Sequence, residues 1–506
     1  MQANVKVWPM ITGEISPLIY GHFIEHVGRC IYGGIFDPTC SKAEPHGFRV
    51  DVIQAAKKIK CPLLRWPGGN FASAYHWMDG IGPLEERPQR INYIWGGLEP
   101  NQFGTDEFIE YCRLVGAAPY ITVNLGTGTL DEALYWLEYC NLDTPTKYAT
   151  LRKKNGRAEP YKVKYWGIGN EVYGEWQVGH CKAEEYAEKC RQYAQFMKAI
   201  DPTIKLVAVG ADDPDWDLVV LKRAGKAIDY ISIHQYHGSE DYYETVAAAY
   251  YVEKRLKLLA DLINHLGLEH VRIALDEWNV WYQVDPAQEA AEKGMVFLEE
   301  PYAFKDALFA AGVFLVLHRM SNIVGMANLA QMVNALGMIK TRGDAIVLTP
   351  IYHVFDLFVN HTGRIRLGLE IVSDTYSIKA RSFIGGRLSF ALDRVPYLDG
   401  SATYDPDRQM IYLALVNFYK DGTYEVKIDL KDMPISNEVL VRELTAPDPY
   451  ATNDFNAPNT VIPRKRTIFV NKRSFIIQLP AHSLTIFEFP VNRALAAGTA
   501  EESKAS

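Results

Sequence analysis

An amide and a carboxylate follow a short apolar segment in the first half of the chain. Residues 162–168 have the β-branched and aromatic content of a buried strand, and Gly169 separates them from Asn170 and Glu171. In barrel enzymes the reactive side chains stand at the carboxyl ends of buried parallel strands. The other interpretation is an exposed turn that carries an acid, and this segment by itself fits both.

A second candidate carboxylate lies in the segment Leu275-Asp-Glu-Trp278. Because side chains alternate across a strand, Asp276 and Glu277 are expected to point to opposite sides. Glu277 is nearer the end of the segment and is predicted to enter the site, whereas Asp276 is expected to face the helix layer or to form a structural pair. Two carboxyl groups about 5–5.5 Å apart, one an acid and base and the other a nucleophile, hydrolyse glycosidic bonds with retention. Glu171 and Glu277 are the candidates for this pair.

The elements that must bring these residues together alternate between strand-like and helix-like patterns. The expected strands are residues 19–25, 62–66, 119–124, 162–168, 204–209, 229–234, 271–276 and 323–328, and the expected helices are residues 51–59, 105–115, 131–139, 183–200, 216–224, 246–266 and 304–318. Such alternation indicates parallel strands with right-handed crossovers, and eight units favour a closed (β/α)₈ TIM barrel. The alternative is a doubly wound open sheet, which would usually show an early phosphate-binding glycine turn.

Strand-like segments follow one another without helices in the last third of the chain. This pattern predicts an antiparallel β-sandwich of the jelly-roll type. We therefore predict an N-terminal strand within residues 1–17 that joins the sandwich, a catalytic barrel over 18–357, the sandwich over 358–493 and a disordered tail over 494–506.

Composition is that of a soluble globular protein, with 48% apolar and 23% charged residues among 506. The net charge of −8 argues against non-specific binding to nucleic acid, and no apolar segment approaches the roughly 18 residues of a membrane span. Met1–Trp8 lacks a basic region followed by an apolar one, so we expect no secretory signal. The seven cysteines are irregularly spaced, which favours reduced thiols in a cytoplasmic protein over disulfides or a zinc site.

Polar residues occur at seven of the eight expected strand ends. They are Glu25, Arg65 with Asn70, Asn124, Asn170 with Glu171, His234 with Tyr236, Glu277 with Asn279, and Asn328 with Gln331. Strand ends converge at the mouth of a barrel, so we expect one shared polar site. There Asn170 is placed to bond a sugar 2-hydroxyl and Tyr236 to orient the nucleophile. The tryptophans at 66, 95, 278 and 281 either stack on sugar rings or pack the loops.

Two competing motifs are weaker. His22-Phe-Ile-Glu-His26 matches the H-x-x-E-H pattern of inverted zinc peptidases, but that chemistry needs a helix, and this segment has a strand-like pattern. Asn124-Leu-Gly-Thr-Gly128 resembles a truncated dinucleotide-binding turn without its third glycine.

Four segments resemble family 51 of the glycoside hydrolases, the intracellular α-L-arabinofuranosidases. They are Gly21-His-Phe-Ile-Glu-His-Val-Gly-Arg29, Arg65-Trp-Pro-Gly-Gly-Asn-Phe71, Trp166-Gly-Ile-Gly-Asn-Glu171 and Asp276-Glu-Trp-Asn-Val-Trp281. The resemblance extends over nearly the whole chain and implies a (β/α)₈ barrel with a β-sandwich. It also implies retaining hydrolysis of terminal arabinofuranosyl units from arabinoxylan or arabinan fragments.

Carried over to this sequence, the resemblance implies that Glu171 is the acid/base and Glu277 the nucleophile. The residues that it places around the arabinose are Glu25, Arg65, Asn70, Trp95, Asn170, His234, Tyr236, Trp281 and Gln331. It further implies a homo-oligomer, typically a hexamer, in the cytoplasm, with no metal and no organic cofactor. From charge and hydropathy we expect no nucleic-acid and no membrane partner.

Three other functions stay open at this point. The same pair of carboxylates serves other sugars on this fold, so β-xylosides or β-glucans are alternative substrates. The second alternative is a zinc peptidase that uses the His22 motif, and the third is a carbohydrate-binding protein without catalytic activity.

Overall fold

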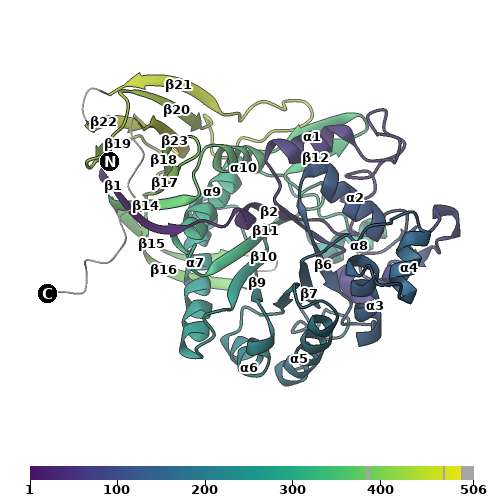
Figure 1. The fold of residues 1–506 in the computed structure, drawn as a ribbon. Coiled ribbons are helices and arrows are strands. Elements are labelled where there is room, and N and C mark those ends of the chain that lie inside the picture. The colour runs from purple at the N-terminus through teal and green to yellow at the C-terminus, as the bar shows by residue number, and fades with distance from the viewer. Residues whose placement is uncertain (383–387, 471–472, 492–506) are drawn as a thin grey trace.

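The computed structural model describes residues 1–382, 388–470 and 473–491. Figure 1 shows two parts, a barrel surrounded by helices and a large curved β-sheet that contains the N-terminus. The predicted tail, residues 494–506, lies outside the described residues. No described helix combines the length and the apolar character that crossing a membrane requires.

Eight parallel strands form a closed barrel, which confirms the predicted (β/α)₈ architecture. In their order around the barrel they are β2 (Gly21–Phe23), β3 (Leu63–Trp66), β6 (Ala118–Val123), β7 (Tyr165–Ile168), β8 (Lys205–Ala208), β9 (Tyr230–His237), β10 (Arg272–Val280) and β11 (Val324–Ala330). β11 pairs with β2 through Asn328 and Gly21, which closes the ring. Tyr120, Tyr165 and Met326 are among the residues that fill its interior.

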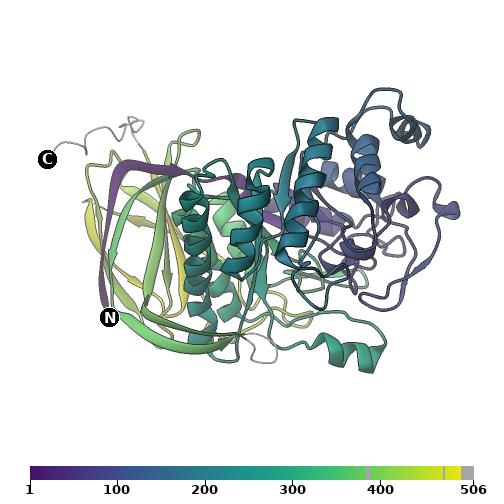
Figure 2. The same ribbon diagram turned by 90° about the horizontal axis from the view of Figure 1, so that it is seen from below.

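The helices lie outside the barrel strands (Figure 2). They are α1 (Val50–Lys58), α2 (Thr105–Val115), α3 (Leu130–Asn141), α4 (Lys147–Lys154), α5 (Ala183–Ile200), α6 (Pro214–Ala224), α7 (Tyr242–His265), α8 (Pro286–Lys293), α9 (Phe304–Arg319) and α10 (Pro350–Asn360). The predicted bounds of α2 and α5 are confirmed. α7 begins four residues before its predicted start because the Asp241 side chain accepts the N–H of Glu244 and caps the helix.

Nine strands form the second part, in the order β21-β20-β23-β18-β17-β14-β1-β19-β22. Their bounds are β1 (Gln2–Glu14), β14 (Ile365–Val372), β17 (Leu398–Asp405), β18 (Met410–Asn417), β19 (Tyr424–Leu430), β20 (Glu438–Leu444), β21 (Arg464–Phe469), β22 (Ser474–Leu479) and β23 (Ser483–Pro490). The predicted all-antiparallel arrangement is wrong for one pair, since β1 runs parallel to β19 and antiparallel to β14. The predicted domain boundaries stay predictions.

The two parts are joined by a strand that is buried on both faces. Along β18, Ile411, Leu413 and Leu415 belong to the core enclosed by the curved sheet, and the alternate residues belong to the core that includes α9. α9 is apolar around nearly its whole circumference, as expected for a helix packed between two layers.

Three short hairpins complete the strands. They are β4 (Arg90–Ile91) with β5 (Leu98–Glu99), β12 (Ile339–Arg342) with β13 (Ala345–Leu348), and β15 (Thr375–Ser382) with β16 (Leu388–Pro396). The last pair was expected within the sandwich but forms its own two-stranded sheet beside α7, where Phe390 stacks on Tyr251.

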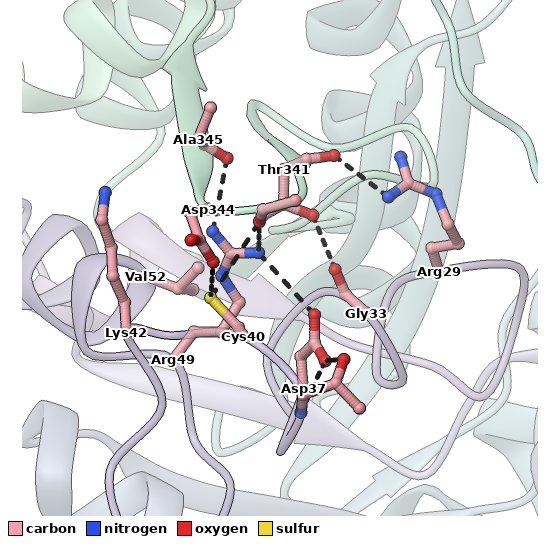
Figure 3. A network of polar contacts seen from close by, with 12 residues as sticks. Arg29, Gly33, Asp37, Cys40, Lys42, Arg49, Val52, Thr341, Asp344 and Ala345 are labelled. Atoms are coloured by element: carbon pink, nitrogen blue, oxygen red, sulfur yellow. Dashed lines mark hydrogen bonds and ion pairs between the residues drawn. The ribbon is translucent and has the colours of Figure 1, made fainter.

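A buried arginine fastens the long loop after β2 to the β12–β13 turn (Figure 3). The Arg49 guanidinium donates to the Gly343 and Ala345 carbonyls at 2.6 and 3.3 Å and forms two bonds with Asp51. Close by, Arg29 donates to the Thr341 carbonyl at 3.0 Å. The same loop carries Glu25, so these contacts position one wall of the barrel mouth.

We predict that Arg49→Met lowers the free energy of unfolding by about 3–5 kcal/mol, because Asp51 is left without its buried partner. Urea unfolding monitored by tryptophan fluorescence measures this change. Arg90→Met is the matched control, since its ion pair with Asp79 is exposed and contributes about 1 kcal/mol or less. Equal losses in the two variants would contradict the assignment.

Candidate active site

A β-bulge in β10 directs two successive carboxylates into the barrel. Ala274 pairs with Ser232 and Glu277 with His234, so two residues of β10 lie opposite the single residue Ile233 of β9. The prediction that Asp276 and Glu277 point to opposite sides is therefore wrong. Of the two expectations for Asp276, the structural pair is the one observed: it lies 3.6 Å from Arg65 and accepts a hydrogen bond from Tyr120 at 2.7 Å.

Arg65, from the end of β3, lies at the centre of the site. Its guanidinium donates to Glu277 Oε1 at 2.5 Å and to Asn170 Oδ1 at 2.6 Å. The ring of Phe23 packs against its face, with the guanidinium carbon 4.8 Å from the ring centroid. One buried cation thus connects the ends of β3, β7 and β10.

Glu277 is held at both oxygens. Arg65 occupies Oε1, and the Tyr236 hydroxyl donates to Oε2 at 2.7 Å. The ring of Trp281 meets that of Tyr236 edge-on, with centroids 5.4 Å apart. Trp281 therefore fixes the tyrosine rather than the carboxylate.

Glu171 stands after β7 with its backbone in the left-handed region, at φ 45°. Its Oε1 lies 2.8 Å from His234 Nδ1 and accepts the Tyr173 hydroxyl at 3.3 Å, and its Oε2 accepts the Trp176 indole N–H at 3.1 Å. Burial raises the pKa of Glu171, but the contacts with His234, together with the Trp176 hydrogen bond and the charge of Arg65, outweigh it and the net shift is downward. Tyr173 and Trp176 were not predicted as site residues, and their nearness to Glu171 in the chain was the available signal.

Carboxylates surround His234 on β9. Nδ1 faces Glu171 and lies 3.6 Å from Glu277 Oε2, and Nε2 lies 3.3 Å from Asp276 Oδ1. Burial lowers the pKa of the imidazole, but the three carboxylates, led by Glu277, raise it to about 10. The ring is therefore protonated at neutral pH.

Glu25 lies at the inner end of the site and accepts three hydrogen bonds. Phe71 N–H and Trp95 Nε1 each donate to Oε1 at 2.9 Å, and Gln331 Nε2 donates to Oε2 at 3.2 Å. Gly69 allows this close approach, because a Cβ there would lie 2.9 Å from Oε2. Burial and the charge of Glu277 raise the pKa of Glu25 to about 8 against the effect of these donors, so it is neutral at pH 7.

The structure brings all the predicted site residues to the barrel mouth, with Asn70 accepting from Asn170 at 3.3 Å. Other strand-end amides hold the backbone instead: Asn124 caps residues 126–127, Asn279 bonds the Ala330 and Leu336 carbonyls, and Asn328 bonds the His22 carbonyl. Among the tryptophans considered for stacking, Trp66 and Trp278 are buried in the core.

The two histidines of the H-x-x-E-H motif are separated by the fold. The ring of His22 packs on Phe355, with centroids 4.7 Å apart. His26 lies 2.8 Å from Glu99 and accepts the Trp66 N–H, whereas Glu25 enters the polar site. These three side chains therefore do not form the zinc-peptidase arrangement, which the sequence left open only as an alternative.

Among the described residues, the side chains whose metal-ligand atoms converge are Glu171, His234 and Glu277, with one atom of each within 4.8 Å of the others. A cation would have to displace the proton on His234 and compete with Arg65 for Glu277. The group is thus suited to holding protons rather than a metal.

Comparisons with known proteins identify the family of the chain. Residues 55–254 match the family model described as alpha-L-arabinofuranosidase 1 domain, and residues 276–483 match the alpha-L-arabinofuranosidase C-terminal domain. The chain is 40% identical to alpha-L-arabinofuranosidase C of Emericella nidulans, over 87% of this chain and 88% of that protein. The chain belongs to family 51 of the glycoside hydrolases, the α-L-arabinofuranosidases.

A solved structure shares the whole fold, and a second curated relative matches along nearly the whole chain. The α-L-arabinofuranosidase of Thermotoga maritima, crystallised with arabinose, is 48% identical and superposes with a TM-score of 0.92 over 96% of this chain and 99% of that one. The intracellular exo-alpha-L-arabinofuranosidase of Bacteroides ovatus is 34% identical over 94% of this chain and 93% of that protein. The family resemblance in the sequence is therefore confirmed.

The raised pKa of Glu25 predicts a pH-dependent difference in stability between the protein and its Glu25→Gln variant. A raised pKa means that the contribution of Glu25 to stability is complete below pH 4.5 and is lost as the pH rises towards 8. The variant should therefore gain in melting temperature relative to the parent from pH 5 to 8, with the gain levelling off above 8. Thermal unfolding at each pH tests this, and a constant difference would contradict it.

Proposed function

We propose that the protein is a retaining, exo-acting α-L-arabinofuranosidase that releases terminal non-reducing α-L-arabinofuranosyl residues from arabinoxylan- and arabinan-derived oligosaccharides. The observation that carries the proposal is the approach of the two carboxylates, since an oxygen of Glu171 lies within 4.8 Å of an oxygen of Glu277. Retaining glycosidases keep their carboxyl groups about 5–5.5 Å apart, whereas inverting enzymes need about 6.5–9.5 Å to admit a water molecule.

In the proposed first step Glu277 is the nucleophile and Glu171 the acid. A Glu277 oxygen bonds to the anomeric carbon while Glu171 gives a proton to the glycosidic oxygen, and the leaving sugar departs as an alcohol. Arg65 and Tyr236 hold the attacking carboxylate in position. The product is a covalent arabinosyl-enzyme.

In the second step Glu171 acts as a base. It takes a proton from water, whose oxygen bonds to the anomeric carbon and releases Glu277. The arabinose keeps its α configuration because each step inverts it once. The two carboxylates supply the nucleophile and the proton, so the proposed reaction needs no cofactor.

The burial of the site supports action at chain ends. Glu25, Arg65, Asn170 and Gln331 are buried at the inner end of the site. Beside Glu171, at the other end, Trp176 is 61% exposed. A terminal arabinofuranosyl unit therefore fits against Glu25, with Asn70 and Trp95 beside it, while the leaving group extends past Trp176 to solvent.

We further propose that the protein is a homohexamer that works in the cytoplasm. The proposal rests on the family resemblance and on the name of the Bacteroides ovatus relative, which is called intracellular. Light scattering of the purified protein measures the oligomeric state, and a monomer would contradict the first part.

Two variants test the proposed roles with an aryl α-L-arabinofuranoside. Glu277→Ala should abolish turnover, because no covalent intermediate forms. Glu171→Ala should slow hydrolysis about 10²–10⁴-fold. Added azide should accelerate this variant and yield the α-azide, because a small anionic nucleophile needs no general base.

Product configuration and substrate choice complete the test. ¹H NMR in the first minutes of the reaction should show α-arabinofuranose, and the β anomer would exclude retention. Aryl β-xylosides and β-glucosides are the comparison substrates. A higher kcat/KM on either, or normal turnover by either Glu variant, would overturn the proposal.

A further inference from the structure

The proposed acid, Glu171, is surrounded by hydrogen-bond donors. The Trp176 N–H and the Tyr173 hydroxyl both point at its oxygens, and His234 Nδ1 lies closest, at 2.8 Å. Nε2 of the same ring lies 3.3 Å from Asp276, so both ring nitrogens face carboxylate oxygens, which suits an imidazolium beside an ionised Glu171. The resting site therefore holds the proton needed for the first step somewhere other than on Glu171.

The three carboxylates that face His234 come from two elements of the barrel. Glu171 comes from the end of β7, and Asp276 and Glu277 come from the bulge in β10. The other cation of the site, Arg65, binds Glu277 and Asn170 and lies 3.6 Å from Asp276. With its side chain only 5% exposed, the imidazolium is stabilised by these charges, which raise its pKa to about 10.

We propose that His234 stores the proton of the reaction and passes it from Nδ1 to Glu171 Oε1 as Glu277 attacks the sugar. This inference rests on the proposed function. In the first step the proton moves from His234 to Glu171 and on to the glycosidic oxygen, whose bond to the anomeric carbon breaks. In the second step the proton of the attacking water moves to Glu171 and returns to His234 Nδ1.

The loss of charge on Glu277 determines when His234 releases its proton. Glu277 makes the largest attractive contribution to the imidazolium. When Glu277 forms an ester with the sugar, its negative charge disappears and His234 holds its proton less strongly. Nucleophilic attack thereby promotes proton transfer to Glu171, and release of the ester restores the original state. His234 does not react with the sugar and acts through Glu171, so it is a positioning residue.

The dependence of rate on the leaving group tests the inference. His234→Gln keeps a hydrogen-bond donor but cannot store a proton. With 2,4-dinitrophenyl α-L-arabinofuranoside, whose leaving group needs no protonation, kcat/KM should stay within about fivefold of the parent. With the phenyl glycoside and with arabino-oligosaccharides it should fall about 10²–10⁴-fold. A similar loss on all substrates would indicate a purely structural role and overturn the inference.

His180→Gln is the matched control, because His180 Nδ1 contacts the Val172 carbonyl next to Glu171 without touching a carboxylate of the site. It should leave the leaving-group dependence unchanged, and a dependence like that of His234→Gln would overturn the inference. The unmutated protein tests the proposed function separately, because that proposal fails if it hydrolyses no arabinofuranoside. If the unmutated protein is active and His234→Gln is slowed equally on all substrates, only the proton store is refuted.

A direct readout follows the proton itself. ¹⁵N NMR of histidine-labelled protein at pH 7.5 should show His234 as an imidazolium, identified by its absence from His234→Gln. After Glu277 is trapped with a 2-fluoro-arabinofuranosyl donor, the same ring should become neutral. A neutral ring in the free enzyme, or an unchanged imidazolium in the trapped one, would overturn the inference.

Discussion

The site depends on one buried cation. Arg65 is completely enclosed and binds Glu277 and Asn170 while lying near Asp276. Removing a charge from water costs several kcal/mol, which only well-placed opposite charges offset. β7 and β10 supply these partners. Both strands must therefore end at the same level along the barrel axis as the Arg65 guanidinium at the end of β3. That requirement links the barrel register to the position of both candidate carboxylates.

The bulge in β10 satisfies the requirement. A regular strand would present either Asp276 or Glu277 to the interior, and Arg65 and His234 would then face fewer negative charges. With the extra residue, Asp276 and Glu277 both face the two cations. The four groups neutralise one another in a region of low exposure, and Glu171 completes the set from the opposite side of His234.

Support for this arrangement comes from loops far from it in the sequence. Glu25 lies on the loop after β2 and Gln331 on the loop after β11, and the side chain of Asn334 joins these loops by bonding the Arg29 carbonyl and Thr341. Arg49 adds the contacts with the β12–β13 turn (Figure 3). On the other side, α9 anchors the barrel to the curved sheet through β18. The inner end of the site is thus held by contacts from several loops, and the exposed part lies around Trp176.

The sequence alone determined the barrel fold and which strand ends supply the main polar residues of the site. Strand and helix periods are local, and parallel strands bring their carboxyl ends together by topology, so Glu25, Arg65, Glu171 and Glu277 were predicted to meet. The tertiary structure decided the features that strand and helix periodicity does not encode. A one-residue bulge turned Asp276 inward, β1 paired parallel to β19, and His234 came to lie between three carboxylates. Each of these outcomes depends on the register between segments distant in the chain, and a shift of one residue changes the direction of a side chain without changing composition or periodicity.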